Sequence, residues 1–486
     1  MLLVLRRWLP IALIALVALW LRTRDLAARP MHSDEANQAV KFGELLETGH
    51  YAYDPHDHHG PTLYYAALPI AWLRGQRTLA ALDEITLRLV PALFGTIAVV
   101  LVFLLATPGG DAGPAARIFP LLAAALLAVS PPAVYYSRDF IQETLLLTFV
   151  LASFVCVQRW WRSGHLRWAI ASGVCMGLAL STKISAPLFL LAGLVAVLAA
   201  RPLAAGASTR VARDVFAGVG AVLVTVALLY SSFGTHFAGI CDAGAALVYG
   251  LHRAGGGDTG HEKPWWYYLR LFGRQRDGGL VFVQIAFTTL ALAGAVLSIA
   301  RRAGILRWAA IYALILGAVL SLTPYKTPWH AIHLVPGLAL LAAGAIAALP
   351  KLWLSLALAA VVLAFQVKQT DLVTILRPAD PRNPYAYVHS SPDVLKFRAR
   401  ADAALARHPG GVIRVISGEY WPLPWYFRGL PRVGYWTSPP ADCDGALVIA
   451  SAALAPSVRA QLHGAYDETY LGLRPGFLCV VFTPRP

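Results

Sequence analysis

Two adjacent carboxylates, Asp34 and Glu35, follow the first long apolar stretch of this chain. A carboxylate at a bilayer edge is costly unless it meets water, a partner or a substrate, so its position favours a functional role over a solvated loop pair. Ser33 precedes a polar, alanine-containing segment and predicts a helix with Ser33 as N-cap and both acids in the first turn. The helix dipole there stabilises their charged forms. We interpret Asp34 as a candidate catalytic base or cation ligand, and Glu35 either as its catalytic neighbour or as a residue that only stabilises the helix start.

A histidine-rich turn, HDHHGP, follows at residues 56–61. Imidazoles close to carboxylates can bind a transition metal, although this spacing matches no established metal signature. Loop histidines also bind water or phosphate, and phosphate is the ligand expected for His59. The candidate ligands of a divalent metal are Asp34, Glu143, His56 and His58.

A second polar cluster lies in SPPAVYYSRDFIQET, residues 130–144. Arg138 and Asp139 occupy a turn, and Glu143 comes one helical turn after Asp139, so the two carboxylates can share a face. They form either a second acidic site for a metal or reacting centre, or, in the case of Arg138 and Asp139, an interfacial anchor.

Basic side chains occur at the ends of later apolar stretches. Lys183 follows one of them, and Lys326 and His330 lie in the segment YKTPWH. Each lysine alone could simply extend its ammonium to the interface. Together with Arg138 they predict an anion pocket, suited to a phosphate or pyrophosphate that stays at the membrane face.

A further segment, HEKPWWYYL, contains His261, Glu262 and Lys263 and follows a glycine-rich stretch at residues 255–260. Glycines make a mobile lid over a substrate site plausible. An ordinary aromatic belt at the membrane interface explains the tryptophans equally well.

The composition is that of an integral membrane protein. Of 486 residues, 57% are hydrophobic and 14% are charged, and the mean hydropathy is +0.58, whereas soluble domains carry about a quarter charged residues. About eleven apolar stretches approach the roughly 20 residues that a spanning helix needs. They cover residues 3–21, 86–106, 118–130, 141–157, 168–180, 187–200, 215–230, 280–300, 305–322, 331–349 and 352–365. Two of them, 118–130 and 168–180, are short, and loss of either would invert the topology of everything that follows.

Basic residues gather in the short connections on the side of the N-terminus. The positive-inside rule therefore predicts a multi-pass plasma-membrane protein with a cytoplasmic N-terminus, and places residues 22–85, 131–140, 231–279 and the tail outside. No small-residue cleavage site follows the first stretch, so we expect a retained anchor. The net charge of +15 then lies largely against anionic lipid, and nucleic acid is not needed as a partner.

From about Lys368 the pattern changes and predicts an extracytoplasmic α/β domain, residues 368–486, after a transmembrane catalytic part, residues 1–367. Strand-like runs occupy residues 411–416, 445–450 and 477–482, and helix-like stretches occupy 392–407 and 456–463. The aromatic segment EYWPLPWY, residues 419–426, either binds a sugar or peptide acceptor or is a packing cluster. Cys443 and Cys479 either pair in an oxidising compartment or remain free.

The ordered set of motifs resembles the GT-C superfamily of integral-membrane glycosyltransferases. The motifs are the DE pair after the first helix, HGP followed by YY, RLVPALFG at residues 88–95, SPPAVYYSRD, TK and YKTPWH. The branch of protein O-mannosyltransferases and aminoarabinose transferases is the most similar. Within it, HEKPWWYYL, YKTPWH, YVHSSPDV and EYWPLPWYFRG resemble bacterial and archaeal proteins labelled flippase-activity-associated and linked to archaeal N-glycosylation.

This resemblance implies a donor sugar carried on a polyprenyl phosphate and transferred at the outer face, with inversion and without a covalent sugar–enzyme intermediate. The catalytic acid of the family corresponds to Asp34, with Glu35 beside it, and the second acid corresponds to Asp139 or Glu143. Lys183 and the basic groups near YKTPWH would hold the phosphate. The acceptor, whether protein, lipid or glycan, is not implied.

We therefore expect a polytopic α-helical membrane protein of GT-C type with an α/β tail, acting as an inverting glycosyltransferase. The expected partners are a polyprenyl-phosphate-linked sugar and membrane lipids. A divalent metal remains open, and no organic cofactor is expected. The alternative is a transporter or a component of a lipid-linked-sugar flippase, in which the same charges would be coupling groups. Transporters place such charges near the bilayer midplane in pseudo-symmetric halves, whereas here they fall at the ends of stretches and no repeat is visible, which favours the enzyme.

Overall fold

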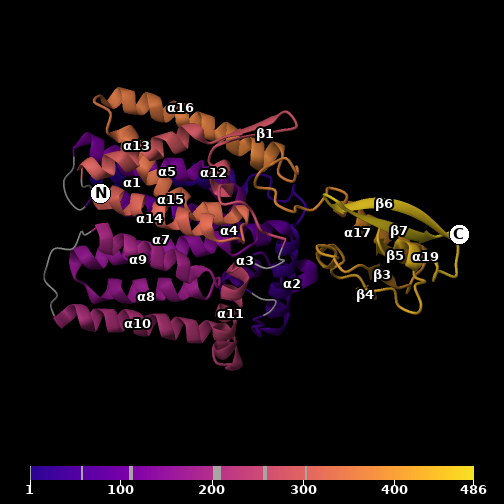
Figure 1. Ribbon diagram of the computed structural model, residues 1–486. Helices are drawn as coiled ribbons and strands as arrows, with labels where there is room; N and C mark the ends of the chain where they lie inside the picture. The colour runs from indigo at the N-terminus through magenta and orange to yellow at the C-terminus, as the bar shows by residue number, and fades with distance from the viewer. Residues whose placement is uncertain are drawn as a thin grey trace. The chain divides into compact units, whose positions relative to one another are not determined.

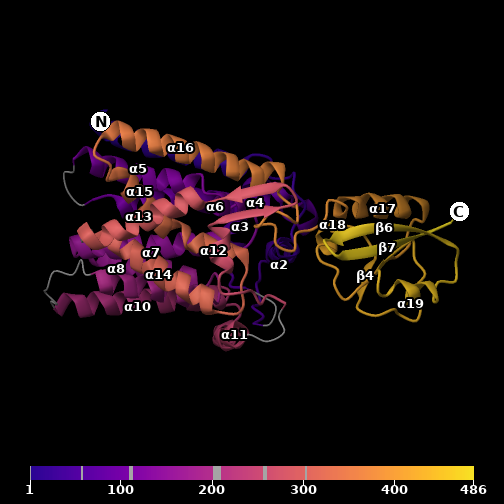
Figure 2. The same cartoon turned by 45° about the horizontal axis from the view of Figure 1, so that its top comes forward.

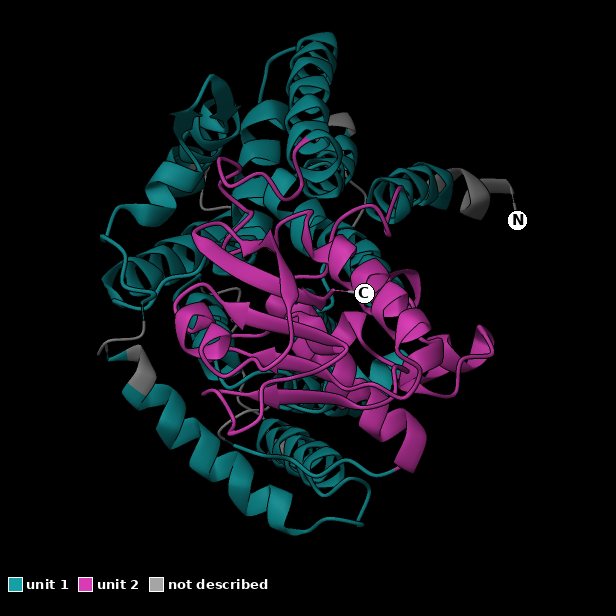
Figure 3. Cartoon of the chain, turned by 90° about the vertical axis from the view of Figure 1, so that its right-hand side faces the viewer, with its two compact units in different colours: residues 1–24, 50–67, 88–376 teal, residues 25–49, 68–87, 377–486 magenta. Residues whose placement is uncertain are grey.

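The computed structural model describes residues 2–55, 59–108, 113–200, 209–255, 260–301 and 304–485. The chain forms two compact units, coloured separately in Figure 3. Unit 1 comprises residues 1–24, 50–67 and 88–376, and unit 2 comprises residues 25–49, 68–87 and 377–486. The segment that carries Asp34 thus belongs to the same compact unit as the tail.

Unit 1 is a bundle of apolar helices. Its helices are α1 (Leu2–Thr23), α5 (Pro114–Ala128), α6 (Pro131–Tyr136), α7 (Glu143–Ser163), α8 (Leu166–Leu180), α9 (Ala186–Ala200), α10 (Thr209–Tyr230), α11 (Ala238–Ala254), α12 (Tyr267–Leu271), α13 (Ile285–Arg301), α14 (Gly304–Leu322), the 3-10 helix η2 (Pro328–His333), α15 (Val335–Ala347), α16 (Leu352–Asp371) and the π-helical turn η3 (Leu372–Leu376). Helices α3 (Thr62–Leu73) and α4 (Glu84–Ala106) each contribute residues to both units.

Each of the expected apolar spans contains a helix. Among the described residues, six helices are long and apolar enough to cross a membrane: Glu84–Ala106, Glu143–Ser163, Val211–Tyr230, Gly304–Leu322, Pro328–Ala347 and Leu352–Leu376. The expectation of a multi-pass membrane protein is confirmed, while the count of eleven stays a prediction because several of the other apolar helices are shorter.

The expected span at residues 280–300 begins too early. Residues before Ile285 form an antiparallel hairpin, in which β1 (Arg274–Asp277) pairs with β2 (Leu280–Val283). The hairpin turns at Gly278 and Gly279, whose φ angles are 48° and 84°. Two glycines with positive φ suit the tight turn of a hairpin, so this turn overrides the apolar character of the following residues.

Small residues bring the helices of unit 1 close together. Helix α8 packs against α7 and α10, and α8 and α10 run side by side in Figures 1 and 2. At Gly173 of α8, a Cβ atom would lie 2.1 Å from the carbonyl oxygen of Gly218 in α10. A glycine at such a contact lets two helix backbones approach closely, which is how membrane helices commonly associate.

Unit 2 is built on a five-stranded mixed sheet with the order β4-β3-β5-β7-β6. Strand β3 (Ile413–Ile416) runs parallel to β4 (Val433–Trp436) and β5 (Leu447–Ser451), whereas β7 (Phe477–Pro484) is antiparallel to β5 and to β6 (Tyr466–Arg474). The unit also contains α2 (Ser33–Thr48), the 3-10 helix η1 (Leu79–Ala81), α17 (Val394–Arg407), α18 (Leu423–Tyr426) and α19 (Ala455–Arg459). The three expected strands and both expected helical regions of the tail are therefore present, with β4 and β6 added.

Alternation along the central strands supplies the core of unit 2. Ile416, Val448, Val480 and Phe482 are buried in one apolar cluster. Cys443 belongs to the same cluster, and both Cys443 and Cys479 are free thiols, so the pairing considered for them is not present. Burial raises the pKa of the Cys479 thiol to about 12.

Part of the aromatic segment at residues 419–426 serves packing. Trp425 is fully buried, and its indole N–H donates to Glu84 Oε1 at 2.8 Å. The guanidinium of Arg428 stacks on this ring at 3.7 Å and donates to the carbonyl oxygen of Leu82 at 2.9 Å. For Trp425 the packing alternative is the one that the structure supports, while Tyr420 and Trp421 remain partly exposed.

Candidate functional site

The start of helix α2 presents Asp34 and buries Glu35. The helix begins at Ser33, and its N-cap is His32 rather than the expected Ser33. The backbone N–H of Asp34 donates to His32 Nδ1 at 3.0 Å, and the backbone N–H of His32 donates to Glu35 Oε2 at 3.0 Å. The Nδ1 atom of His32 thus accepts the backbone hydrogen bond that a serine hydroxyl accepts in an ordinary capping box.

The hydrogen bonds of His32 define its tautomer. Its Nε2 lies 3.0 Å from the carbonyl oxygen of Tyr387, so Nε2 carries the proton and donates, while Nδ1 accepts from Asp34. The preceding residue is held as well, because the backbone N–H of Met31 donates to Tyr426 Oη at 2.9 Å and Ser390 Oγ donates to Met31 O at 2.7 Å. The tail residues thus fix the backbone on which Asp34 stands.

The two neighbouring acids have different surroundings. The side chain of Asp34 is 53% exposed, whereas that of Glu35 is fully buried and pairs with Arg29 at 3.3 Å. Glu35 therefore closes the helix start and neutralises a buried arginine. Asp34 is the member of the pair whose carboxylate is free to meet a substrate from solvent.

In unit 1, a buried carboxylate is surrounded by basic groups. Glu143, the first residue of α7, forms an ion pair with Lys183 through Oε1 and accepts a hydrogen bond from His333 Nε2 on Oε2 at 3.2 Å. His330 Nε2 lies 3.8 Å from Oε1. All four side chains are buried or nearly so. We refer to these four residues as the Glu143 cluster.

Aromatic rings line this cluster. The ring of His333 stacks on Phe189 of α9 with a centroid separation of 3.8 Å and an interplanar angle of 19°. The ammonium of Lys183 lies 5.9 Å from the centroid of Trp329. The stacking fixes the plane of the His333 imidazole, and the Trp329 ring offers the Lys183 ammonium a cation–π contact next to the Glu143 carboxylate.

The HGP turn positions the lysine segment. Thr62 donates to the carbonyl oxygen of Ser181 through its N–H at 3.2 Å and through Oγ1 at 2.8 Å. A Cβ atom at Gly60 would lie 2.1 Å from that same oxygen, so only glycine allows the turn to approach the backbone just before Lys183. The sequence motif is therefore a close contact between two loops of unit 1.

Several other predicted residues lie in unit 1 with identified contacts. Arg138 Nη1 donates to the carbonyl oxygens of Leu21 at 3.1 Å and Arg22 at 3.4 Å, at the C-terminal end of α1. Such contacts are those of a helix cap. Asp139 is buried in the turn between α6 and α7, and the carbonyl oxygen of His59 accepts from Tyr51 Oη at 3.1 Å.

The expected lid segment pairs with the YKTPWH segment. Glu262 forms an isolated antiparallel bridge with Tyr325, and the backbone N–H of Lys326 donates to His261 O at 3.0 Å. The N–H of Lys263 donates to the carbonyl oxygen of Pro324 at 3.3 Å. The ammonium of Lys326 donates to the carbonyl oxygen of Thr323. The segment is thus anchored by backbone pairing next to η2.

The predicted metal site with Asp34, Glu143, His56 and His58 as ligands stays a prediction. His56 and His58 lie outside the described residues. Both oxygens of Glu143 already accept from a lysine and a histidine, an arrangement that stabilises a carboxylate without a metal. Asp34 belongs to unit 2 and Glu143 to unit 1.

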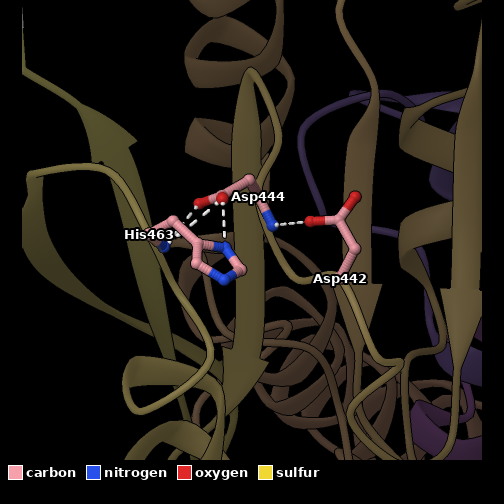
Figure 4. Close-up of side chains that lie close together, drawn as sticks. All are labelled: Asp442, Asp444 and His463. Atoms are coloured by element: carbon pink, nitrogen blue, oxygen red, sulfur yellow. Dashed lines mark hydrogen bonds and ion pairs between the residues drawn. The ribbon is translucent and has the colours of Figure 1, made fainter.

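A different group, at the edge of the tail sheet, has metal-compatible residue types. Asp442, Asp444 and His463 offer ligand atoms within 4.8 Å of one another. His463 Nδ1 lies 2.9 Å from Asp444 Oδ2, and the N–H of Asp444 donates to Asp442 Oδ1 at 2.9 Å (Figure 4). Arg414 pairs with Asp442 at 2.7 Å. Burial alone would raise the pKa of the Asp444 carboxyl, but hydrogen bonds from His463 and Tyr466 lower it. These hydrogen bonds connect two loops and account for the group without a metal.

Comparison with known proteins identifies the architecture. Residues 58–230 match the family described as dolichyl-phosphate-mannose-protein mannosyltransferase, abbreviated PMT. The structure matches ArnT from Cupriavidus metallidurans bound to undecaprenyl phosphate with a TM-score of 0.66 and 15% identity over 97% of each chain. Residues 58–230 are thus similar to the PMT family, and the fold of the whole chain is similar to that of ArnT. The predicted resemblance to this superfamily is confirmed.

Two other solved structures match less extensively. The Pmt1-Pmt2 complex of S. cerevisiae bound to its sugar donor matches with a TM-score of 0.39 and 21% identity, over 48% of this chain and 34% of that one. EmbB from Mycobacterium smegmatis matches with a TM-score of 0.40 and 14% identity, over 76% of this chain and 37% of that one. No curated protein sequence matches this one.

The segment that matches the PMT family, residues 58–230, contains Glu143 and Lys183 but not Asp34, His330 or His333. Sequence reasoning did not single out His333. A signal was present, because His333 follows His330 by three residues and such residues share a face of a helical segment. Gly60 was recognised only as part of a turn, since the loop that it contacts is distant in sequence.

Proposed function

We propose that this protein is an inverting membrane glycosyltransferase that moves a sugar from a polyprenyl-phosphate donor to an acceptor at the extracytoplasmic face. The observation that carries the proposal is the buried Glu143 cluster. Its Glu143 and Lys183 lie in the segment that matches the PMT family, and the ammonium of Lys183 is the cation that would bind a lipid phosphate. ArnT, whose fold this chain shares, has been seen with undecaprenyl phosphate. A lipid phosphate is a good leaving group, so cations that stabilise its charge could supply much of the rate.

Asp34 is the base of the proposed reaction. Its carboxylate is the exposed member of the acidic pair, and its backbone is fixed by the His32 cap and the Tyr426 hydroxyl. It accepts the proton of the acceptor hydroxyl as that oxygen attacks the anomeric carbon, and the bond from this carbon to the phosphate oxygen breaks with its electron pair. Inversion follows from attack opposite the leaving group.

No step is assigned to a metal, because the Glu143 carboxylate is already satisfied by Lys183 and His333. We propose a cytoplasmic N-terminus, in accordance with the basic short loops, so that unit 2 lies outside the cell membrane. The loop between β3 and α18 then contributes Tyr420 and Trp421, which are partly exposed, to acceptor contacts.

The test is transfer by the purified full-length protein in lipid nanodiscs. Radiolabelled polyprenyl-phosphate sugars are supplied with a membrane extract as acceptor source, and the label is followed into protein, lipid and glycan fractions. Label that moves from the polyprenyl phosphate in the presence of wild type, and not of Asp34→Asn, supports the proposal. Label that stays on the lipid but crosses the bilayer of reconstituted vesicles would instead identify a flippase component.

A further inference from the structure

Before the donor binds, the positive and negative charges of the Glu143 cluster are equal in number. Lys183 carries one positive charge and Glu143 one negative charge, and they are paired. The cluster also contains the titratable imidazoles of His330 and His333 from η2, and among the described residues Tyr268 from α12 and Tyr325 before η2 face it. With neutral imidazoles and phenols the cluster has no net charge, which is the favourable state for buried groups.

A donor phosphodiester would change this balance by one unit. It brings one negative charge, and the lysine that binds it is the counter-ion of Glu143. The carboxylate would then remain buried beside a phosphate with a single cation between two anions. Adding one proton to the cluster restores neutrality, so donor binding is expected to be accompanied by proton uptake.

The geometry distinguishes the two histidines as sites for that proton. His333 donates from Nε2 to Glu143, and its Nδ1 has no hydrogen-bond partner among the described residues. A proton on that Nδ1 would create a buried N–H without an acceptor, which costs free energy. His333 therefore stays neutral and positions the carboxylate.

His330 has oxygen atoms on both sides of its ring. Its Nδ1 lies 3.3 Å from Thr327 Oγ1 and 3.4 Å from Tyr268 Oη, and its Nε2 faces Glu143 Oε1. The hydroxyl of Tyr268 uses its own proton to donate to the carbonyl oxygen of Thr327 at 3.0 Å, so its oxygen can accept. A doubly protonated His330 would thus have hydroxyl acceptors for its Nδ1–H and an anionic ion-pair partner at 3.8 Å for its Nε2–H.

We infer that His330 takes up one proton when a polyprenyl phosphodiester binds, and replaces Lys183 as the counter-ion of Glu143. This inference rests on the proposed function, because it requires that Lys183 binds the donor phosphate. The proton comes from solvent, adds to the vacant imidazole nitrogen and leaves again when the lipid dissociates. Donor binding is therefore tighter at lower pH, over the range in which the empty cluster is unprotonated.

The test is isothermal titration calorimetry of the full-length protein in nanodiscs with a polyprenyl methyl phosphate diester, which does not itself titrate near neutral pH. Titrations at one pH in three buffers of different ionisation enthalpy give the number of protons exchanged. Wild type is expected to take up about one proton per lipid, with Kd rising about tenfold per pH unit. His330→Gln, which cannot become charged, is expected to take up none and to bind with a Kd that does not depend on pH.

His165→Gln is the matched control, because His165 is exposed at the turn between α7 and α8 and contacts Ser163. It should retain the uptake of one proton. If His330→Gln does not fold, Glu143→Gln provides a second arm: without the carboxylate, phosphate binding to Lys183 is already neutral and no proton is needed.

The outcomes separate the inference from the proposed function. Binding by wild type without proton uptake, or uptake that persists in His330→Gln or Glu143→Gln, overturns the inference and leaves donor binding intact. A wild-type protein that does not bind the phosphodiester at all overturns the proposed donor and the inference together.

Discussion

Replacing Asp34 by asparagine should remove catalysis without unfolding the protein. The side chain is 53% exposed, and the cap of α2 uses the backbone N–H of Asp34 and the side chains of His32 and Glu35, all of which remain in Asp34→Asn. We therefore expect a change in unfolding free energy of less than about 0.5 kcal/mol, as for an ordinary surface substitution. Turnover should fall by about 10² to 10⁴, the usual contribution of a general base. This factor corresponds to roughly 2.7–5.5 kcal/mol of transition-state stabilisation.

Glu35→Gln is the matched substitution at the neighbouring position. It removes a buried charge that pairs with Arg29 and accepts from the N–H of His32, so it should cost about 1.5–3 kcal/mol of stability. Activity per folded molecule should fall far less than in Asp34→Asn. The measurements are initial transfer rates, normalised to folded protein from a thermal unfolding assay. Asp34→Asn with a rate within a few-fold of wild type, or a larger catalytic loss in Glu35→Gln, would refute the assignment.

Three further predictions follow from the contacts in each unit. Lys183→Met should weaken binding of a polyprenyl phosphodiester by roughly 1.5–3 kcal/mol and should destabilise the fold, because it leaves the buried Glu143 carboxylate without its counter-ion. The double variant Lys183→Met/Glu143→Gln removes that unpaired charge and should recover thermal stability but not binding. Recovery of binding would contradict the role of Lys183 in phosphate binding. Gly60→Ala should reduce donor binding at least several-fold, because its Cβ would overlap the Ser181 carbonyl, whereas a Cβ at Gly113 meets nothing within 4 Å and Gly113→Ala should behave as wild type. The Arg382 guanidinium hydrogen-bonds Asp380 and lowers its pKa from 3.8 to about 2, so this carboxylate contributes stability above its unfolded pKa that is lost as the pH falls from about 4 to about 2; the difference in melting temperature between wild type and Asp380→Asn should shrink over that interval, and a constant difference would show that the ion pair is not responsible.

The sequence alone determined the membrane helices and the strands of the tail. Apolar length and the short apolar runs of β3, β5 and β7 are local properties, which can be recognised without knowledge of distant residues. Leu280–Val283 was misassigned to a membrane span, because the two glycines with positive φ that precede it turn the chain into a hairpin, which hydropathy alone does not indicate. The N-cap of α2 was predicted to be Ser33, because serine is a statistically favoured cap. The structure has His32 in this position, and the hydrogen bond between its Nε2 and the Tyr387 carbonyl oxygen, which fixes the imidazole, cannot be predicted from local sequence.

The sequence also selected the residues with chemical potential, but only the tertiary structure separated their roles. Asp34 and Glu35 are adjacent and chemically alike, and their difference arises because Arg29 and the His32 backbone bury one carboxylate and leave the other exposed. Glu143 and Lys183 were assigned to an acidic site and a phosphate site, yet they form one ion pair between the start of α7 and the turn between α8 and α9. Burial and ion pairing depend on which segments pack together, and that information lies in contacts between distant parts of the chain, which local composition and spacing do not encode.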